Sequence, residues 1–203
     1  GWFAREAKLF ADIGDALLIG NAREIKLKRV LIARDALSRM PDGEREAAAD
    51  AARQVVEKLG VESEEIEVAV EGLDRWFAAF RHIQALEIWA NHADWIGENT
   101  PACGPGVKER FAYASKLTDV DRAEHQPVRD IARARVDELL GHGDAIILMP
   151  TAPASPKRDA TNAEIEDFRA RTMGLTCISG LSGCPQISLP LAAADAPLGI
   201  SLL

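Results

Sequence analysis

Hydrophobic and polar positions follow two patterns along this chain, one typical of amphipathic helices and the other of short strands. Apolar residues that recur every three to four positions predict helices, which we place at residues 5–18, 43–59, 73–96 and 121–140. Short aliphatic runs predict strands at 29–33, 66–70 and 144–150. The alternation of helices with short apolar strands indicates an α/β layered fold.

Glycines mark the expected ends of three of these helices. Gly20-Asn21, Gly60 and Gly141 each follow the last apolar positions of a helical pattern, where a glycine commonly closes the final turn. The turn-rich segment 101–111 is expected to lead into a further helix near Val107.

The last sixty residues have the arrangement that builds binding clefts in α/β proteins. A strand at 144–150 leads through a proline-stiffened loop to a helical segment. A turn of small residues at 178–186 follows, where glycines allow the backbone to approach a ligand. Residues 144–150 and 185–203 are therefore expected to supply central strands.

The composition is that of a soluble globular protein, with 47% of the 203 residues hydrophobic and 28% charged. A formal net charge of −8 argues against nucleic acid as the main partner. No apolar run has the roughly 18 residues that a membrane span needs, and no signal peptide is visible. The three cysteines are odd in number and form no Cys-x-x-Cys pair, which favours a reduced, cytoplasmic compartment.

Recognisable catalytic sets are missing from the sequence. Ser182 fails the G-x-S-x-G pattern because Cys184 stands at the position of the second glycine. No S-x-x-K and no nucleotide-binding glycine pattern occurs, and the scattered histidines lack metal-ligand spacing. Cys184 lies among apolar residues that would raise its pKa, so a packed cysteine is favoured over a nucleophile. We expect neither a metal nor an organic cofactor.

One helical segment has a polar continuation of its apolar stripe. Leu73, Trp76 and Ile83 belong to that stripe, and Gln84 and Glu87 follow on the same face. Such a pair must find hydrogen-bond partners. It predicts either a clamp onto a neighbouring loop or the lining of a substrate channel.

Four motifs in the tail resemble the amidase signature family by their order and spacing. They are LMPTAP at 148–153, R-x-R-x-x-x-L-T at 169–176, ISGLSGCPQISLP at 178–190 and PLGISLL at 197–203. The opening GWFAR at 1–5, Phe80-Arg81 with Gln84 and Glu87, and Gly104-Pro105 with Arg110-Phe111 are similar to the family as well. The resemblance covers essentially the whole chain.

This resemblance implies an α/β/α fold with a mixed central sheet flanked by helices. It also implies that residues 1–203 are the C-terminal portion of one amidase domain. Within it we expect a core helix at 1–20, a variable outer lobe at 21–140, and core strands with substrate-channel loops at 141–203. The apolar ends at Gly1 and Leu203 favour a piece of a longer polypeptide.

The family hydrolyses C–N amide bonds with a Ser–cis-Ser–Lys triad, which the resemblance places upstream of Gly1. No catalytic residue is therefore expected in this chain, which should be inactive without the N-terminal half of its domain. The resemblance implies that two loops border the substrate channel, and packing of strand against helix is the other interpretation of them. The candidate channel residues are Thr151, Ala152, Pro153, Ile178, Leu181, Cys184 and Pro185.

Two alternatives to an amidase portion remain open at this point. One is a non-catalytic amidase-like protein kept for binding or docking, and the other is the amidase subunit of a tRNA-dependent amidotransferase. The expected partner is a small-molecule amide, without nucleic acid or membrane. Aromatic residues also offer surface for a homodimer contact, namely Trp76, Phe77, Phe80, Trp89 and Trp95.

Overall fold

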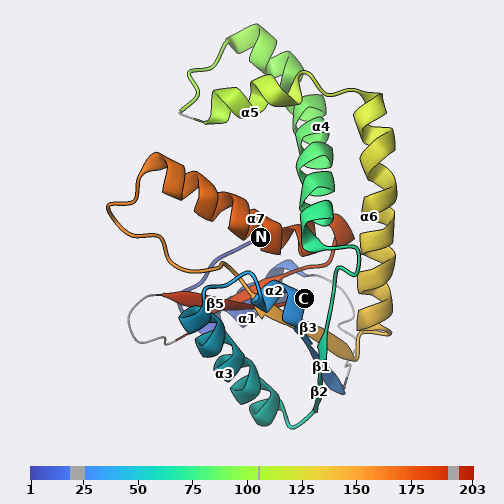
Figure 1. Cartoon of the computed structure of the whole chain (residues 1–203), viewed down its shortest axis with the longest axis vertical. Coiled ribbons are helices and arrows are strands. Elements are labelled where there is room, and N and C mark those ends of the chain that lie inside the picture. Colours follow the sequence, from blue (N-terminus) through green and yellow to red (C-terminus); the bar gives the residue numbers. More distant parts are fainter. Residues whose placement is uncertain (19–25, 105, 192–196) are drawn as a thin grey trace.

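A five-stranded mixed sheet lies at the centre of the protein (Figure 1). The computed structural model describes residues 1–18, 26–104, 106–191 and 197–203. The strands, in chain order, are β1 (Arg29–Ala33), β2 (Glu62–Ile66), β3 (Ala145–Pro150), β4 (Ile187–Leu191) and β5 (Leu198–Leu202). The helices are α1 (Ala7–Leu17), α2 (Arg34–Leu37), α3 (Asp42–Leu59), α4 (Leu73–Asn99), α5 (Val107–Ala114), α6 (Asp119–Leu140) and α7 (Asn162–Ser182).

The sheet has the order β2-β1-β3-β5-β4. β1 pairs in parallel with both β2 and β3, whereas β5 runs antiparallel to β3 and to β4. This mixed sheet, with helices on its faces, confirms the predicted fold class. The tail supplies β3 and β5 as central strands, as predicted, whereas β4 lies at the edge of the sheet. Gly20, Asn21 and Pro105, which the sequence placed in turns, lie outside the described residues.

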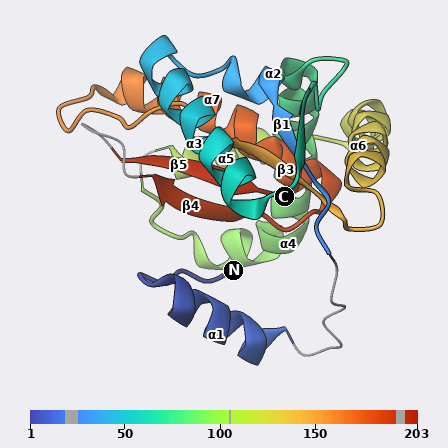
Figure 2. The same cartoon turned by 90° about the horizontal axis from the view of Figure 1, so that it is seen from below.

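Alternating side chains of the inner strands are buried in two separate apolar layers. Leu31, Ile147 and Met149 pack with residues of α4, α6 and α7 on one face. Val30 and Leu148 pack on the other face, against α3. Because successive side chains of a strand point to opposite faces, β1 and β3 are held between two helical layers, as Figure 2 shows from below.

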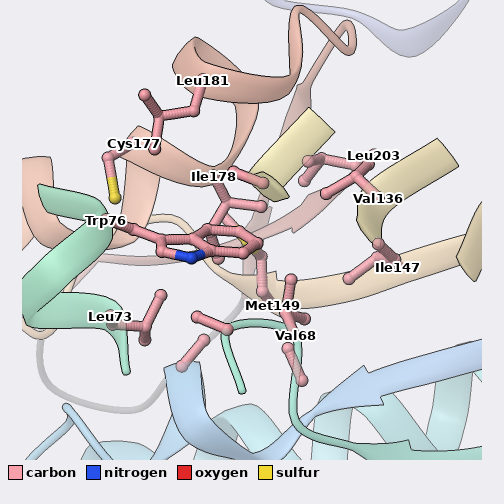
Figure 3. Packing of buried hydrophobic residues seen from close by; sticks show 14 of the residues in the cluster. Val68, Leu73, Trp76, Val136, Ile147, Met149, Cys177, Ile178, Leu181 and Leu203 are labelled. Atoms are coloured by element: carbon pink, nitrogen blue, oxygen red, sulfur yellow. The ribbon is translucent and has the colours of Figure 1, made fainter. Parts of the chain in front are cut away.

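Trp76 of α4 is the largest fully buried side chain and lies in the middle of the larger core. Figure 3 shows its ring beside Cys177 and Ile178 of α7, with Met149 of β3 nearby. Its indole Nε1 donates to Glu71 Oε2 at 3.2 Å, so the polar end of the ring is not left unpaired.

The strand predicted at 66–70 forms four residues earlier, at Glu62–Ile66. It pairs in register from Arg29 opposite Glu62 to Ala33 opposite Ile66, and β1 ends there because α2 begins at Arg34. Residues beyond Ile66 therefore have no strand to pair with. The apolar run was misleading because Val68 and Ala69 are buried beneath α4 outside any strand.

The turn predicted at 178–186 is shorter than expected. Helix α7 runs to Ser182 and ends at Gly183, which adopts a left-handed conformation with φ +75°. At Gly180 the ring of Phe80 from α4 approaches so closely that a Cβ would lie 2.3 Å from Phe80 Cε2. Gly180 thus allows α4 and α7 to cross in contact, while the turn itself is left to Gly183 and its neighbours.

Two parts of the predicted domain division show additional features. β1 and β2 come from the predicted outer lobe at 21–140, yet they belong to the same sheet as β3. Helix α1 forms within the predicted core helix at 1–20, but none of its residues is buried and it lies away from the sheet (Figure 2). The division itself stays a prediction.

None of the helices in the described ranges combines the length and apolarity that a bilayer crossing requires.

The Phe80–Gly180 contact generates a stability prediction. In Gly180→Ala the new methyl group must displace the Phe80 ring, so the free energy of unfolding should fall by about 1–2 kcal/mol despite the better helix propensity of alanine. Gly174→Ala, in the same helix with no atom within 4 Å of the new Cβ, is the matched control and should be neutral or stabilising. Urea unfolding measures both. Equal stability of the two variants would contradict the close contact.

Candidate functional site

A groove of about 760 Å³ lies between α4, α5 and α7, and we call it the α4–α5–α7 groove. Its volume is in the range of roughly 300–1,000 Å³ that is usual for small-molecule sites. In Figure 1 the helices α5 and α7 lie one above the other, and α4 runs beside them. The lining residues are Phe77, Arg81, Gln84, Ala85, Ile88, Gly106, Val107, Glu109, Arg110, Phe111, Tyr113, Ala114, Glu166, Arg169, Ala170 and Met173.

Helical spacing explains why these residues meet. The contribution of α4 follows one face of the helix, at positions 77, 81, 84, 85 and 88. That of α7 follows another such face, at positions 166, 169, 170 and 173. The crossing of α4 and α7 at Phe80 and Gly180 holds the two faces at a fixed relative position.

Arg81 is held by aromatic contacts within the groove. Its guanidinium carbon lies 5.7 Å from the ring centroid of Phe77 and 6.0 Å from that of Tyr113. Both distances are within the range of cation–π attraction. Such contacts use the charge of the guanidinium and leave its N–H donors available.

Gln84 and Glu87, the polar residues that follow the apolar stripe of α4, have different surroundings. Glu87 accepts a hydrogen bond from Arg129 Nη1 of α6 at 2.8 Å, so it clamps two helices together rather than a helix and a loop. Gln84 lines the groove instead. The channel interpretation thus fits Gln84, and the clamp interpretation fits Glu87.

A second polar cluster joins the ends of three strands. Thr151, directly after β3, has its Oγ1 2.8 Å from Ser188 Oγ of β4 and 2.8 Å from Ser201 Oγ of β5. Gln186 Nε2 donates to Ser201 Oγ at 2.7 Å. Gly199 permits this approach, since a Cβ there would lie 2.9 Å from Thr151 Oγ1. We call these four side chains, Thr151, Gln186, Ser188 and Ser201, the hydroxyl cluster.

The sequence-predicted channel residues fall into two groups, and none of them lines the groove. Thr151, Ala152 and Pro153 follow β3, with Pro153 buried and the other two half-buried. Ile178 and Leu181 lie within α7 in the larger core, with Cys184 packed against it. Pro185 is exposed beyond the helix. Their assignment to a channel stays a prediction.

The sequence did not predict the groove because its lining residues come from three helices that lie far apart along the chain. Several lining residues were named from the sequence without being assigned to one site, among them Phe77, Arg81, Gln84, Arg110 and Phe111. The signal that could have found more of them is the apolar face of the last helix, where Ala170 and Met173 stand four and one positions before Gly174.

Cys177 and Cys184 are poor nucleophiles. Burial raises the pKa of Cys177 to about 12. Burial, together with the negative charge of Asp137, also raises the pKa of Cys184, as its apolar surroundings predicted. The described part of the chain holds no grouping of His, Cys, Asp or Glu side chains that could ligate a metal ion.

Comparison with known proteins relates the chain to amidases. It is 36% identical to Amidase 1 of Oryza sativa subsp. japonica over 61% of this chain and 29% of that protein. It is 31% identical to Amidase 1 of Arabidopsis thaliana over 68% of this chain and 32% of that protein. Outer envelope protein 64, mitochondrial, of Arabidopsis thaliana is 26% identical over all of this chain and 38% of its own length. No family model matches the chain.

Solved structures show the same fold. A crystal structure of an amidase superposes with a TM-score of 0.70 at 20% identity, over 88% of this chain and 42% of that one. A bacterial aryl acylamidase of the amidase signature enzymes superposes with a TM-score of 0.69 at 16% identity, over 89% and 40%. The fold is thus that of amidase-type hydrolases.

This chain belongs to the amidase signature family, as its tail motifs indicated. Its matches lie in the C-terminal part of the relatives, and it spans about a third of the length of those it matches in sequence.

The hydroxyl cluster predicts a stabilising role for Thr151. Thr151→Val removes the oxygen that contacts Ser188 and Ser201. Because each neutral hydrogen bond contributes roughly 1 kcal/mol, the free energy of unfolding should fall by about 1–2 kcal/mol. Thr151→Ser keeps the oxygen and should lose less. Chemical denaturation compares the two. A valine variant as stable as the serine variant would show that the cluster adds nothing.

The raised thiol pKa values predict the pattern of alkylation. At pH 7 the thiolate fraction of Cys184 should be lower than that of an ordinary cysteine, so iodoacetamide should react slowly and its rate should still rise above pH 9. Buried Cys177 should react only after unfolding. Peptide mass spectrometry gives the rates, with the denatured chain as the reference. Rapid modification of Cys184 at neutral pH would contradict its packed state.

Proposed function

We propose that this chain forms the substrate-binding part of an amidase-type hydrolase that cleaves C–N amide bonds of small molecules. The observation that carries the proposal is the α4–α5–α7 groove, a cavity of substrate size in a chain that belongs to the amidase signature family. A Ser–cis-Ser–Lys triad in the sequence that precedes Gly1 would supply the chemistry.

The chemistry of this proposal is acyl transfer. The nucleophilic serine adds to the amide carbon, its proton passes through the bridging serine to the lysine base, and the amine leaves. Water then attacks the acyl-enzyme ester and releases the carboxylate. Backbone N–H donors stabilise the oxyanion in both steps. The share of this chain is to bind and orient the acyl part beside those groups.

The hydroxyls of the hydroxyl cluster are unsuited to the nucleophilic role. Thr151, Ser188 and Ser201 contact one another or Gln186, and their cluster includes no base. A serine hydroxyl without an adjacent base is a weak nucleophile at neutral pH. This supports placing the triad outside residues 1–203.

A second candidate is a binding or docking protein without hydrolase activity. It is favoured by one observation: the match that covers the whole chain is to a protein named for an outer envelope rather than for an amidase. The sequence that precedes Gly1 separates the two candidates, because the hydrolase needs a lysine and two serines there.

A serine-directed fluorophosphonate tests the proposal on the parent polypeptide. We expect a covalent label on one serine upstream of Gly1, none within residues 1–203, and loss of amide hydrolysis in proportion to labelling. The 203-residue chain alone should neither react nor hydrolyse a panel of primary and aryl amides.

Three results would decide against the proposal. Hydrolysis by the isolated chain, or a label on one of its own serines, would place the nucleophile here. A parent that neither reacts nor hydrolyses any amide would favour the docking candidate. The matched control replaces the labelled serine by alanine, which should abolish labelling and turnover while leaving the melting temperature unchanged.

A further inference from the structure

We infer that the α4–α5–α7 groove selects amides whose acyl part has an apolar, aromatic body and a carboxylate remote from the amide that is cleaved. The juxtaposition that carries this inference is a single arginine, Arg81, with an amide side chain, Gln84, on an otherwise apolar helix face. The inference rests on the proposed function, because it names the substrate class for the same site.

Arg81 is the one charged residue that α4 contributes to the groove. Its neighbours three and four positions away on the helix are Ala78, Phe77, Gln84 and Ala85, so α4 supplies no carboxylate to neutralise it. Among the described residues it makes no ion pair. A ligand carboxylate would meet a cation that has no acidic partner within ion-pair distance.

The aromatic contacts prepare Arg81 for this role. Phe77 and Tyr113 attract the positive charge of the guanidinium without accepting a hydrogen bond from it, so its N–H donors remain for a planar acceptor. A carboxylate matches the guanidinium fork with two parallel hydrogen bonds. Gln84 lies three positions after Arg81 on the same helix, and its side chain adds an amide N–H donor to the lining of the groove.

The remaining charges of the groove leave Arg81 in excess. Glu109 on α5 is adjacent to Arg110, and Glu166 on α7 is three positions from Arg169. Neither acid forms an ion pair among the described residues, and the lining as a whole has one net positive charge from three arginines and two glutamates. This is notable in a chain whose formal net charge is −8.

The rest of the lining fits an apolar body. Ile88, Phe111 and Met173 present apolar side chains from α4, α5 and α7 in turn. Aromatic and thioether side chains make favourable contacts with an aromatic ring. A doubly charged phosphate would fit less well than a carboxylate, since Glu109 and Glu166 also face the groove.

Equilibrium binding tests the inference without any need for turnover. The probes are 4-carbamoylbenzoate, which has both groups, and 4-methylbenzamide, its neutral counterpart, titrated into the 203-residue chain. Arg81→Met keeps the length of the side chain and removes the charge. It should weaken binding of the carboxylate about tenfold or more and change binding of the neutral amide by less than about twofold.

Two further variants keep the test sharp. Arg133→Met, at an exposed position of α6 outside the groove, should leave both affinities unchanged. Ala170→Phe places a ring in the groove and should weaken both ligands. Melting curves establish that each variant is folded. Absence of carboxylate binding, phenyl phosphate bound more tightly than the carboxylate, or an equal loss of both amides in Arg81→Met would overturn the inference.

Kinetics on the parent polypeptide separate this inference from the proposed function. If the parent hydrolyses both amides and Arg81→Met lowers kcat/KM for 4-carbamoylbenzoate alone, the result supports both the hydrolase function and the inferred substrate class. Hydrolysis that does not depend on Arg81 overturns the inference and leaves the hydrolase. Charge-dependent binding to the chain without any hydrolysis by the parent overturns the hydrolase and leaves the ligand class of the groove.

Discussion

The burial of β3 on both faces is the constraint on which the rest of the structure depends. Leu148 packs toward α3, while Ile147 and Met149 pack toward α4, α6 and α7. A strand enclosed in this way cannot slip by one residue without exposing its apolar side chains. Its register therefore fixes β1 on one side and β5 on the other, and it places Thr151, the first residue after the strand, against the ends of β4 and β5.

The groove follows from the same layer of helices. Trp76 anchors the start of α4 in the core that β3 shares, and one turn later Phe80 lies on α7 at Gly180. From that crossing α4 extends away from the sheet (Figure 1). Its next residues on that face, Arg81 and Gln84, line the groove. The core thus determines where the lining residues stand, although only Ala85 and Ala114 among them are buried.

The sequence predicted those features that depend on local periodicity. The helices, the strand at 29–33 and the strands of the tail have clear patterns, and the structure contains them near the predicted positions. The strand at 62–66 was misplaced because its side chains are mostly charged and exposed, and only pairing with β1 defines it. The groove could not be predicted because it depends on how three helices pack. Ile178 and Leu181 looked like a channel lining since apolar residues beside glycines are common in both loops and buried helices.

The two polar sites of this chain differ in whether their groups are already satisfied. In the hydroxyl cluster each oxygen contacts another member, so the cluster stabilises the junction of three strands and has little left to offer a ligand. In the groove, Arg81 lies over two aromatic rings and has no carboxylate partner among the described residues. A cation with free donors is suited to recognition rather than to stability. This contrast supports the proposal that the groove binds a ligand, while the cluster stabilises the fold.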